Sequence, residues 1–222
     1  MKKIPWLVIT GLDGAGKTTL VDDLEKMFIE KGLRVMRTRS PHDRYLVKDL
    51  LNVSGDGQPM KDPYTDRLIF ALDNRILGTR IRNWEVSGEY DLILSQRGFF
   101  DSFVHGAVQG YTYSQIADLN RIEDLPRCTV MVHLVAEADT AYSRICNDPD
   151  ADKFETPAYI RKQEIETRRG YRELKAATNP DLASFKGCIN LYVDTTSFTT
   201  EDTFNFVKRK LEKLHIFETK DS

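Results

Sequence analysis

The sequence predicts an α/β protein whose core is a doubly wound, parallel, five-stranded sheet with helices on both faces. Short apolar segments alternate with amphipathic helical segments, and a glycine-rich turn joins the first apolar segment to the first helix. The expected strands are Trp6–Thr10, Leu33–Thr38, Leu92–Ser95, Cys128–Leu134 and Ile189–Val193. We expect one domain, 1–222, because the chain has no long Gly, Ser or Pro linker and its length suits a single α/β core.

Three helical segments have the apolar spacing of a helix that buries one face. In the first segment that face consists of Leu20, Val21, Leu24, Met27 and Phe28. In the second it consists of Leu68, Ile69, Leu72, Ile76 and Trp84. In the last, which we expect to end near His215, it consists of Phe204, Val207, Leu211 and Leu214. Turn-rich segments at 54–63 and 147–152 are predicted to be mobile covers rather than domain boundaries.

The composition indicates a soluble, cytoplasmic protein. Hydrophobic residues make up 41% of the chain, and the formal net charge of -2 gives no overall field that would draw it to nucleic acid. Three cysteines without a CxxC pair suit a reducing compartment. The apolar run Trp6–Ile9 is too short for a signal peptide, and no stretch reaches the length of a membrane span.

The segment Gly11–Thr19 matches the phosphate-binding loop G-x-x-x-x-G-K-[ST] between an expected strand and an expected helix. Glycines allow backbone N–H groups to converge on phosphate oxygens, and the helix amino terminus adds positive charge. The residues expected to hold ATP are Gly11, Gly14, Ala15, Gly16, Lys17, Thr18 and Thr19. Lys17 would reach the β- and γ-phosphates, and the Thr18 hydroxyl would bind Mg²⁺. This context predicts an ATP-dependent phosphotransferase of the P-loop NTPase or nucleotide kinase type.

A second segment, Phe70–Arg75, bears on the phosphate acceptor. Phe70 could stack a base, and Asn74 and Arg75 lie near it on the same expected helix. The alternative is an ordinary core face with a solvated arginine.

Together these two segments resemble the thymidylate kinase family, whose P-loop reads G-x-D/E-G-x-G-K-[ST]-T and whose next motif reads F-A-A-D/N-R. The resemblance extends over most of the chain. Its further parts are Cys128–Leu134 with Ala138, Ala141 and Arg144, then Asp152–Glu155 with Arg168, Arg169 and Tyr171, and finally Val193–Thr195.

The resemblance implies a doubly wound P-loop kinase that uses ATP and Mg²⁺ and acts on a pyrimidine nucleotide. It makes Phe70 the base-stacking residue and Arg75 a ligand of the acceptor phosphate. It places the segment that contains Asp194 against adenine, and it suggests a homodimer.

Three motifs depart from the family. The strand before Gly98 should end in Asp-Arg followed by an aromatic residue, but Gln96 replaces the acid that supports Mg²⁺, while Arg97 is kept. Asp101 lies a few residues on and could reach back to compensate. We therefore expect Gln96, Arg97 and Asp101 to border the acceptor, with Arg97 on its phosphate.

The segment Arg39–Arg44 replaces the family's R-E-P-G-G-T and keeps only its first arginine and the proline. These residues border the acceptor site in the family, so the acceptor could be larger or differently charged than dTMP. Arg37, Arg39 and Arg44 add basic character there, and the alternative is a solvated basic loop.

The third departure concerns the catalytic arginine, because Gly14 stands where some family members carry one in the P-loop. Members with glycine there use an arginine of the lid, which we place roughly at 144–156. Arg144 is the expected charge-stabilising residue, with Arg161 and Arg168 as reserves. The alternative is that Arg144 only pairs with Asp148.

The four histidines have no metal-ligand spacing. We expect His133 to be a hydrogen-bonded core residue of its strand, and His105 could line the acceptor pocket.

Three functions remain open. The first is a kinase for dTMP or a close pyrimidine deoxynucleotide, which needs no strong base. The second is a kinase for a hydroxymethylated pyrimidine such as 5-hydroxymethyluracil, as a nucleotide or within DNA, for which Asp13 or Asp101 would act as a base. The third is a nucleotide-binding module without catalysis, which the intact Lys17-Thr18 pair argues against.

Overall fold

The computed structural model describes the chain except residues 1–3, 43–46, 48–49, 51–61, 148–154 and 217–222. Within the described residues five strands form one parallel sheet in the order β2-β3-β1-β4-β5. The strands are β1 (Trp6–Gly11), β2 (Val35–Arg39), β3 (Leu92–Gln96), β4 (Val130–Val135) and β5 (Ile189–Asp194). All five predicted strands are therefore confirmed, and their ends shift by at most two residues.

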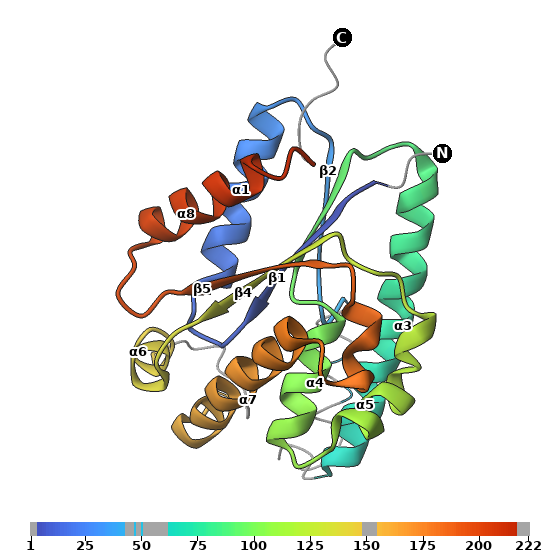
Figure 1. Ribbon diagram of the computed structural model, residues 1–222, viewed down its shortest axis with the longest axis vertical. Coiled ribbons are helices and arrows are strands. Elements are labelled where there is room, and N and C mark those ends of the chain that lie inside the picture. The colour runs from blue at the N-terminus through green and yellow to red at the C-terminus, as the bar shows by residue number, and fades with distance from the viewer. Residues whose placement is uncertain (1–3, 43–46, 48–49, 51–61, 148–154, 217–222) are drawn as a thin grey trace.

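Helices cover both faces of this sheet (Figure 1). Within the described residues the α-helices with defined bounds are α1 (Lys17–Glu30), α3 (Pro63–Ser87), α4 (Phe99–Val108), α5 (Tyr113–Asn120), α6 (Ala138–Ser143), α7 (Pro157–Ala176) and α8 (Thr200–Glu212). Two short 3₁₀ helices, η1 (Ile122–Asp124) and η2 (Pro180–Phe185), connect them. Figure 1 shows α1 and α8 on one side of the sheet and α3, α4 and α5 on the other.

Alternation along the strands explains the two layers. Leu7 and Ile9 of β1 pack into the core beneath α1 and α8, whereas Trp6 and Val8 pack into the core beneath α3, α4 and α5. Successive strand residues point to opposite faces, so a central strand covered on both sides must be apolar throughout. The predicted buried face of α1 is confirmed, since all five of its side chains are buried.

The predicted buried face of α3 is wrong for Leu68 and Leu72, which are exposed. Instead, α3 buries polar side chains as well as apolar ones. Its buried residues are Asp66, Arg67, Ala71, Asp73, Asn74, Leu77, Gly78 and Ile81. Hydrogen bonds satisfy several of the polar groups, so the inward face cannot be found from apolar spacing alone.

His133 is a core residue, as expected. It is fully buried in β4, and its Nε2 lies 2.8 Å from Asn190 Oδ1. Burial lowers the pKa of His133 to about 4, so the ring is neutral at neutral pH. Cys128 and Cys188, both free thiols, meet just before β4 and β5, with their Sγ atoms 2.8 Å apart.

Among the described residues, no helix is long and apolar enough to cross a membrane. The predicted cover at 54–63 falls mostly on residues outside the description, and so does most of the predicted cover at 147–152. The predicted lid at roughly 144–156 is described only at its two ends.

Candidate active site

The phosphate-binding loop connects the carboxyl end of β1 to the amino end of α1. The helix begins at Lys17, and its N-cap is Gly16, which has a left-handed backbone (φ 89°) and no side chain to cap the helix. The first N–H groups of α1 are therefore not capped by a side chain and can bind phosphate oxygens. Thr18 and Thr19 are exposed in this first turn.

Gly14 lies against the backbone of α6. Its φ is 78°, and a Cβ atom built on it would lie 2.1 Å from the carbonyl oxygen of Ala141. A side chain at this position would need both a left-handed backbone and a displaced helix. This close approach gives a physical reason why the loop carries no arginine here.

Lys17 is turned back onto its own loop. Its Nζ donates to the carbonyl oxygen of Leu12 at 2.8 Å and to Asp13 Oδ1 at 3.1 Å. The side chain is only 5% exposed. Burial and the neighbouring charge of Arg97 lower the pKa of Lys17 to about 8. Triphosphate oxygens, which are charged, would be stronger acceptors than the neutral Leu12 carbonyl.

Asp13 and Arg97 form an ion pair beside Lys17. Arg97 follows β3 directly and has a left-handed backbone (φ 67°), which turns its side chain toward the loop. Burial opposes ionisation of Asp13, but the charges of Arg97 and Lys17 outweigh it and hold the pKa of Asp13 well below its usual range. Asp13 is therefore a carboxylate at neutral pH and a weak base.

Asp101 fixes this arrangement from α4. Its Oδ2 accepts hydrogen bonds from Thr10 Oγ1 at 2.7 Å and from the Gly98 backbone N–H at 3.0 Å. Its Oδ1 pairs with Arg97 at 3.3 Å. Both oxygens are thus engaged within the protein, and the expected role of Asp101 toward substrate or metal stays a prediction.

Gln96 lies directly beside the P-loop. Its Nε2 donates to Thr18 Oγ1 at 2.9 Å, so the Gln96 amide positions the Thr18 hydroxyl, which is a neutral oxygen ligand. Mg²⁺ commonly takes one or two protein ligands and fills its shell with phosphate oxygens and water. The Thr18 hydroxyl fits such an ion when a triphosphate is bound. No cluster of three or more acidic, His or Cys side chains suited to a metal occurs in the described part of the chain.

Asn74 is the centre of a buried network on the acceptor side. Its Nδ2 donates to Ser102 Oγ and Asn120 Oδ1, both at 2.7 Å. Ser40 Oγ donates to Asn74 Oδ1 at 3.4 Å, which fastens the segment after β2 to α3. Asn74 is 1% exposed and its amide is occupied, so its contact with substrate stays a prediction.

His42, in the altered segment after β2, is also fastened to α3. Asp73 accepts the His42 backbone N–H at 2.8 Å with each carboxylate oxygen. Arg39 ends β2 opposite Gln96, which leaves its expected substrate role open. Arg37 faces α1 and pairs with Asp22 and Glu25, while Arg44 lies outside the described residues.

Phe70 and Arg75 are not brought together. Arg75 is 43% exposed and pairs with Asp124 at 3.6 Å. The cation over the Phe70 ring is instead Arg67, whose guanidinium carbon lies 4.7 Å from the ring centroid. Sequence reasoning missed Arg67. The sequence did carry a signal for its burial. Arg67 lies seven residues, or two helical turns, before Asn74 and therefore on the same face of the helix.

Arg144 lies between the P-loop and the loop after β5. Its NH1 donates to the carbonyl oxygen of Gly14 at 3.2 Å, and its NH2 donates to that of Thr195 at 2.9 Å. It is exposed and adjoins the donor side of the site. Its alternative partner, Asp148, lies outside the described residues.

The reserve arginines are engaged elsewhere. Arg161 pairs with Asp139 at 3.0 Å, and Arg168 pairs with Glu164 and with Asp194. Asp194 lies at the end of β5 and also accepts from Thr196. Its expected contact with adenine stays a prediction.

His105 lines the acceptor side behind Arg97. Its Nε2 lies 3.3 Å from Arg97 NH1, and its Nδ1 lies 2.8 Å from the Tyr159 hydroxyl. Gln163, also missed from sequence, approaches His105 Nε2 and accepts the Asp13 backbone N–H, both at 3.4 Å. Burial and the charge of Arg97 hold the pKa of His105 well below its usual value.

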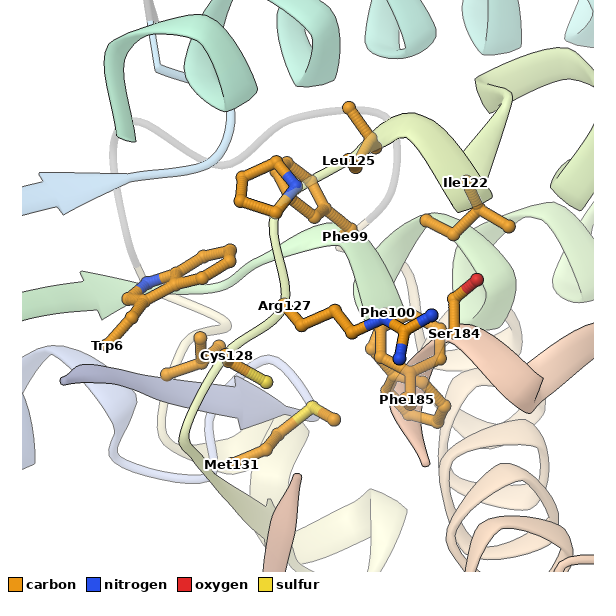
Figure 2. A pocket seen from close by; sticks show the side chains of 12 residues that line it. Trp6, Phe99, Phe100, Ile122, Leu125, Arg127, Cys128, Met131, Ser184 and Phe185 are labelled. Carbon is orange, nitrogen blue, oxygen red and sulfur yellow. The ribbon is translucent and has the colours of Figure 1, made fainter. Parts of the chain in front are cut away.

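A separate pocket opens at the other end of the sheet, near the start of β1 (Figure 2). Trp6, Phe99, Phe100 and Phe185 supply much of its lining. It lies away from the carboxyl ends of the strands, where parallel sheets bind ligands, and its walls are largely apolar. We treat it as a packing gap between layers rather than as part of the active site.

The sheet order and the P-loop at the end of its central strand define a P-loop phosphotransferase with the nucleotide kinase fold. The loop, the buried lysine and the arginine–carboxylate cluster meet at the carboxyl ends of β1 and β3, where that class transfers phosphoryl groups.

Comparison with known proteins shows which proteins the chain is similar to. No family model matches the chain. A thymidylate kinase of Caldicellulosiruptor saccharolyticus is 25% identical over 213 residues, which cover 94% of this chain and 96% of that protein. A probable thymidylate kinase of Sulfurisphaera tokodaii is 27% identical over 164 residues, which cover 72% of this chain and 80% of that protein.

The fold agrees with these relatives. The solved thymidylate kinase of Candida albicans superposes with a TM-score of 0.68 and 15% identity, covering 99% of this chain and 96% of that one. At this identity the superposition shows the fold alone. The sequence matches make the chain similar to thymidylate kinases over most of its length.

Proposed function

We propose that the protein transfers the γ-phosphoryl group of ATP to dTMP or a close pyrimidine deoxynucleotide. The observation that supports this most is the meeting of the P-loop with Arg97 at the end of β3, in a chain whose relatives are named thymidylate kinases. The relatives give no support to a hydroxymethylated acceptor or to a module without catalysis.

Catalysis on this proposal consists of positioning and charge neutralisation. Lys17 binds the β- and γ-phosphates of ATP, and Arg97 binds the acceptor phosphate. Asp13, held between them, keeps both cations in place until the phosphates arrive. A monophosphate is largely ionised at neutral pH, so no strong base is required. The low pKa of Asp13 agrees with this positioning role.

Mg²⁺ would be held by the Thr18 hydroxyl, which Gln96 positions, beside the triphosphate, where it would neutralise phosphate charge. Arg144 is our proposed further cation on the donor phosphates. It donates to the carbonyl oxygens of Gly14, Thr195 and Thr196 and to the Thr195 hydroxyl, which holds it near the loop. Phosphate oxygens are stronger acceptors than these neutral groups. We propose that residues 1–222 act as one domain, with the lid at roughly 144–156.

We propose a homodimer that uses α3. Tyr64, Leu68 and Leu72 are spaced four residues apart and are all exposed, so they form one apolar stripe along this helix. A second copy would cover this stripe. The mass in solution, measured by light scattering, tests this point, and a monomer would contradict it. The free thiols support our proposal of a reducing, cytoplasmic setting.

Labelled ATP with three acceptors tests the proposed function. The acceptors are dTMP, 5-hydroxymethyl-dUMP and duplex DNA that contains 5-hydroxymethyluracil, and Lys17→Ala serves as the blank. We expect label on the phosphate of dTMP. Label only on a hydroxymethyl group would overturn the proposal, and ATP binding without transfer to any acceptor would leave a binding module instead.

A further inference from the structure

Cys128 and Cys188 form a close pair of thiols that the proposed reaction does not use. Their Sγ atoms lie 2.8 Å apart, although 60 positions separate the two residues in the sequence. Both are free cysteines, and both are partly exposed. The third cysteine, Cys146, is exposed just after α6 and donates to the carbonyl oxygen of Ser143 at 3.6 Å. Two of the three cysteines in the chain therefore meet in the fold, and the third stands apart.

The sheet holds these two cysteines side by side. They lie just before β4 and β5, which pair in parallel. The Ile189 backbone N–H donates to the Thr129 carbonyl oxygen at 2.9 Å, which begins the ladder directly beside the thiols. The Cys188 carbonyl oxygen also accepts from Asn190 Nδ2 at 2.9 Å. A covalent S–S bond is about 2.05 Å long, so the sulfurs need to approach by only about 0.8 Å, from backbones that are already held together.

Cys128 is the thiol that a small oxidant reaches first. It belongs to the lining of the pocket at the amino end of the sheet, where Figure 2 shows its side chain among largely apolar ones. Cys188 holds its proton more firmly, because its hydrogen bond with Cys128 and its burial raise its pKa. A cysteine attacks an oxidant as the thiolate, so the proton must leave first. Cys128 is therefore suited to attack the oxidant, and Cys188 is suited to attack the oxidised Cys128.

We propose that Cys128 and Cys188 are a redox modification site, at which hydrogen peroxide closes a reversible disulfide that links β4 to β5. The Cys128 sulfur attacks one peroxide oxygen. The O–O bond breaks, a sulfenic acid forms, and the other oxygen leaves as water with the Cys128 proton. The Cys188 sulfur then attacks the sulfenic sulfur. The S–S bond forms, the S–O bond breaks, and a second water leaves with the Cys188 proton. The two thiols lose two electrons in total, and the peroxide gains them.

The disulfide acts on stability and lies away from the candidate active site. β4 and β5 have six residues each, so the thiols lie roughly 20 Å from the carboxyl ends of the strands, where the P-loop lies. A cross-link over 60 positions restricts the unfolded chain and so stabilises the folded one. In a reducing compartment such a bond is transient and forms when oxidant is present. It also keeps both sulfurs from the irreversible sulfinic acid.

Treatment of the folded, full-length Cys146→Ser protein with hydrogen peroxide tests the proposal. This variant removes the exposed thiol and leaves only the pair. We expect an equimolar amount of peroxide to consume both thiols, and a non-reducing peptide map to show one linkage, between Cys128 and Cys188. The melting temperature should rise by about 5–15 °C and return to its starting value with dithiothreitol. Cys188→Ser in the same background should gain no stability, and excess peroxide should convert its Cys128 to sulfinic acid.

Thiols that both survive peroxide would overturn the proposal, and so would sulfinic acid on either cysteine of the intact pair without a cross-link. A linkage between two molecules, or one that forms only in urea, would also overturn it, because the folded chain would then not bring the thiols together. A linkage within one molecule that leaves the melting temperature unchanged would contradict the stabilising role.

Discussion

The donor and acceptor sides of this site are built in different ways. On the donor side, Gly14 and Gly16 give the backbone its shape, and the helix N–H groups do the binding. On the acceptor side, side chains do both: Asn74 fastens the segment after β2, and Asp101 fixes Arg97. A backbone site tolerates few sequences, whereas a side-chain network can be rebuilt with other residues. This difference explains why the P-loop motif is intact while the acceptor motifs have diverged.

The largest effect should come from breaking the donor backbone. Gly14→Ala places a Cβ against the carbonyl oxygen of Ala141 at a φ of 78°. We expect the affinity for ATP to fall more than about 100-fold, since misplaced loop N–H groups lose several hydrogen bonds to phosphate. Gly32→Ala is the matched control, with a φ of 79° and nothing within 4 Å. It should cost only about 1 kcal/mol of stability. Titration with ATP and denaturant melts measure both, and equal effects of the two variants would contradict this account.

A smaller effect should follow from releasing Arg97 on the acceptor side. Asp101→Asn removes the charge that pairs with Arg97. We expect kcat/KM for dTMP to fall about 10- to 100-fold, with the KM for ATP nearly constant. Asp118→Asn, on the exposed surface of α5, is the control. A rise in the KM for ATP alone would show that Asp101 serves the donor.

The pH dependence sharpens the comparison on the donor side. The pKa of Lys17 is lowered to about 8 in the free protein, so its charged form prevails below that pH and is lost above it. The kcat/KM for ATP, which reports the free protein, should fall about tenfold between pH 7 and pH 9. A profile that stays flat to pH 9 would contradict the burial of Lys17 beside Arg97.

The smallest effect should come from one member of the acceptor network. Ser40→Ala removes a single 3.4 Å hydrogen bond to Asn74. We expect a loss of about 1 kcal/mol in stability and a change of only a few-fold in the KM for dTMP. Urea unfolding and initial rates measure these. A loss of activity as large as that of Asp101→Asn would mean that Ser40 contacts the substrate.

The contrast between the backbone-built donor side and the side-chain-built acceptor side also decides which features could be predicted from the sequence. The strands and the P-loop follow from local patterns, because apolar runs and glycine spacing are written in consecutive residues. The inward face of α3 does not, since Leu72 is exposed while Asp73 and Asn74 are buried by bonds to distant residues. Arg67 escaped notice for the same reason. Only the folded chain shows which polar side chains are buried.

The most direct test of the central claim is a competition among acceptors. An equimolar mixture of dTMP, dCMP, dUMP, dAMP and dGMP is incubated with ATP, Mg²⁺ and the protein, and the diphosphates are quantified by mass spectrometry. We predict that dTDP forms first and predominates. Diphosphates formed without preference for dTMP, or ATP consumed with none of them formed, would contradict the account.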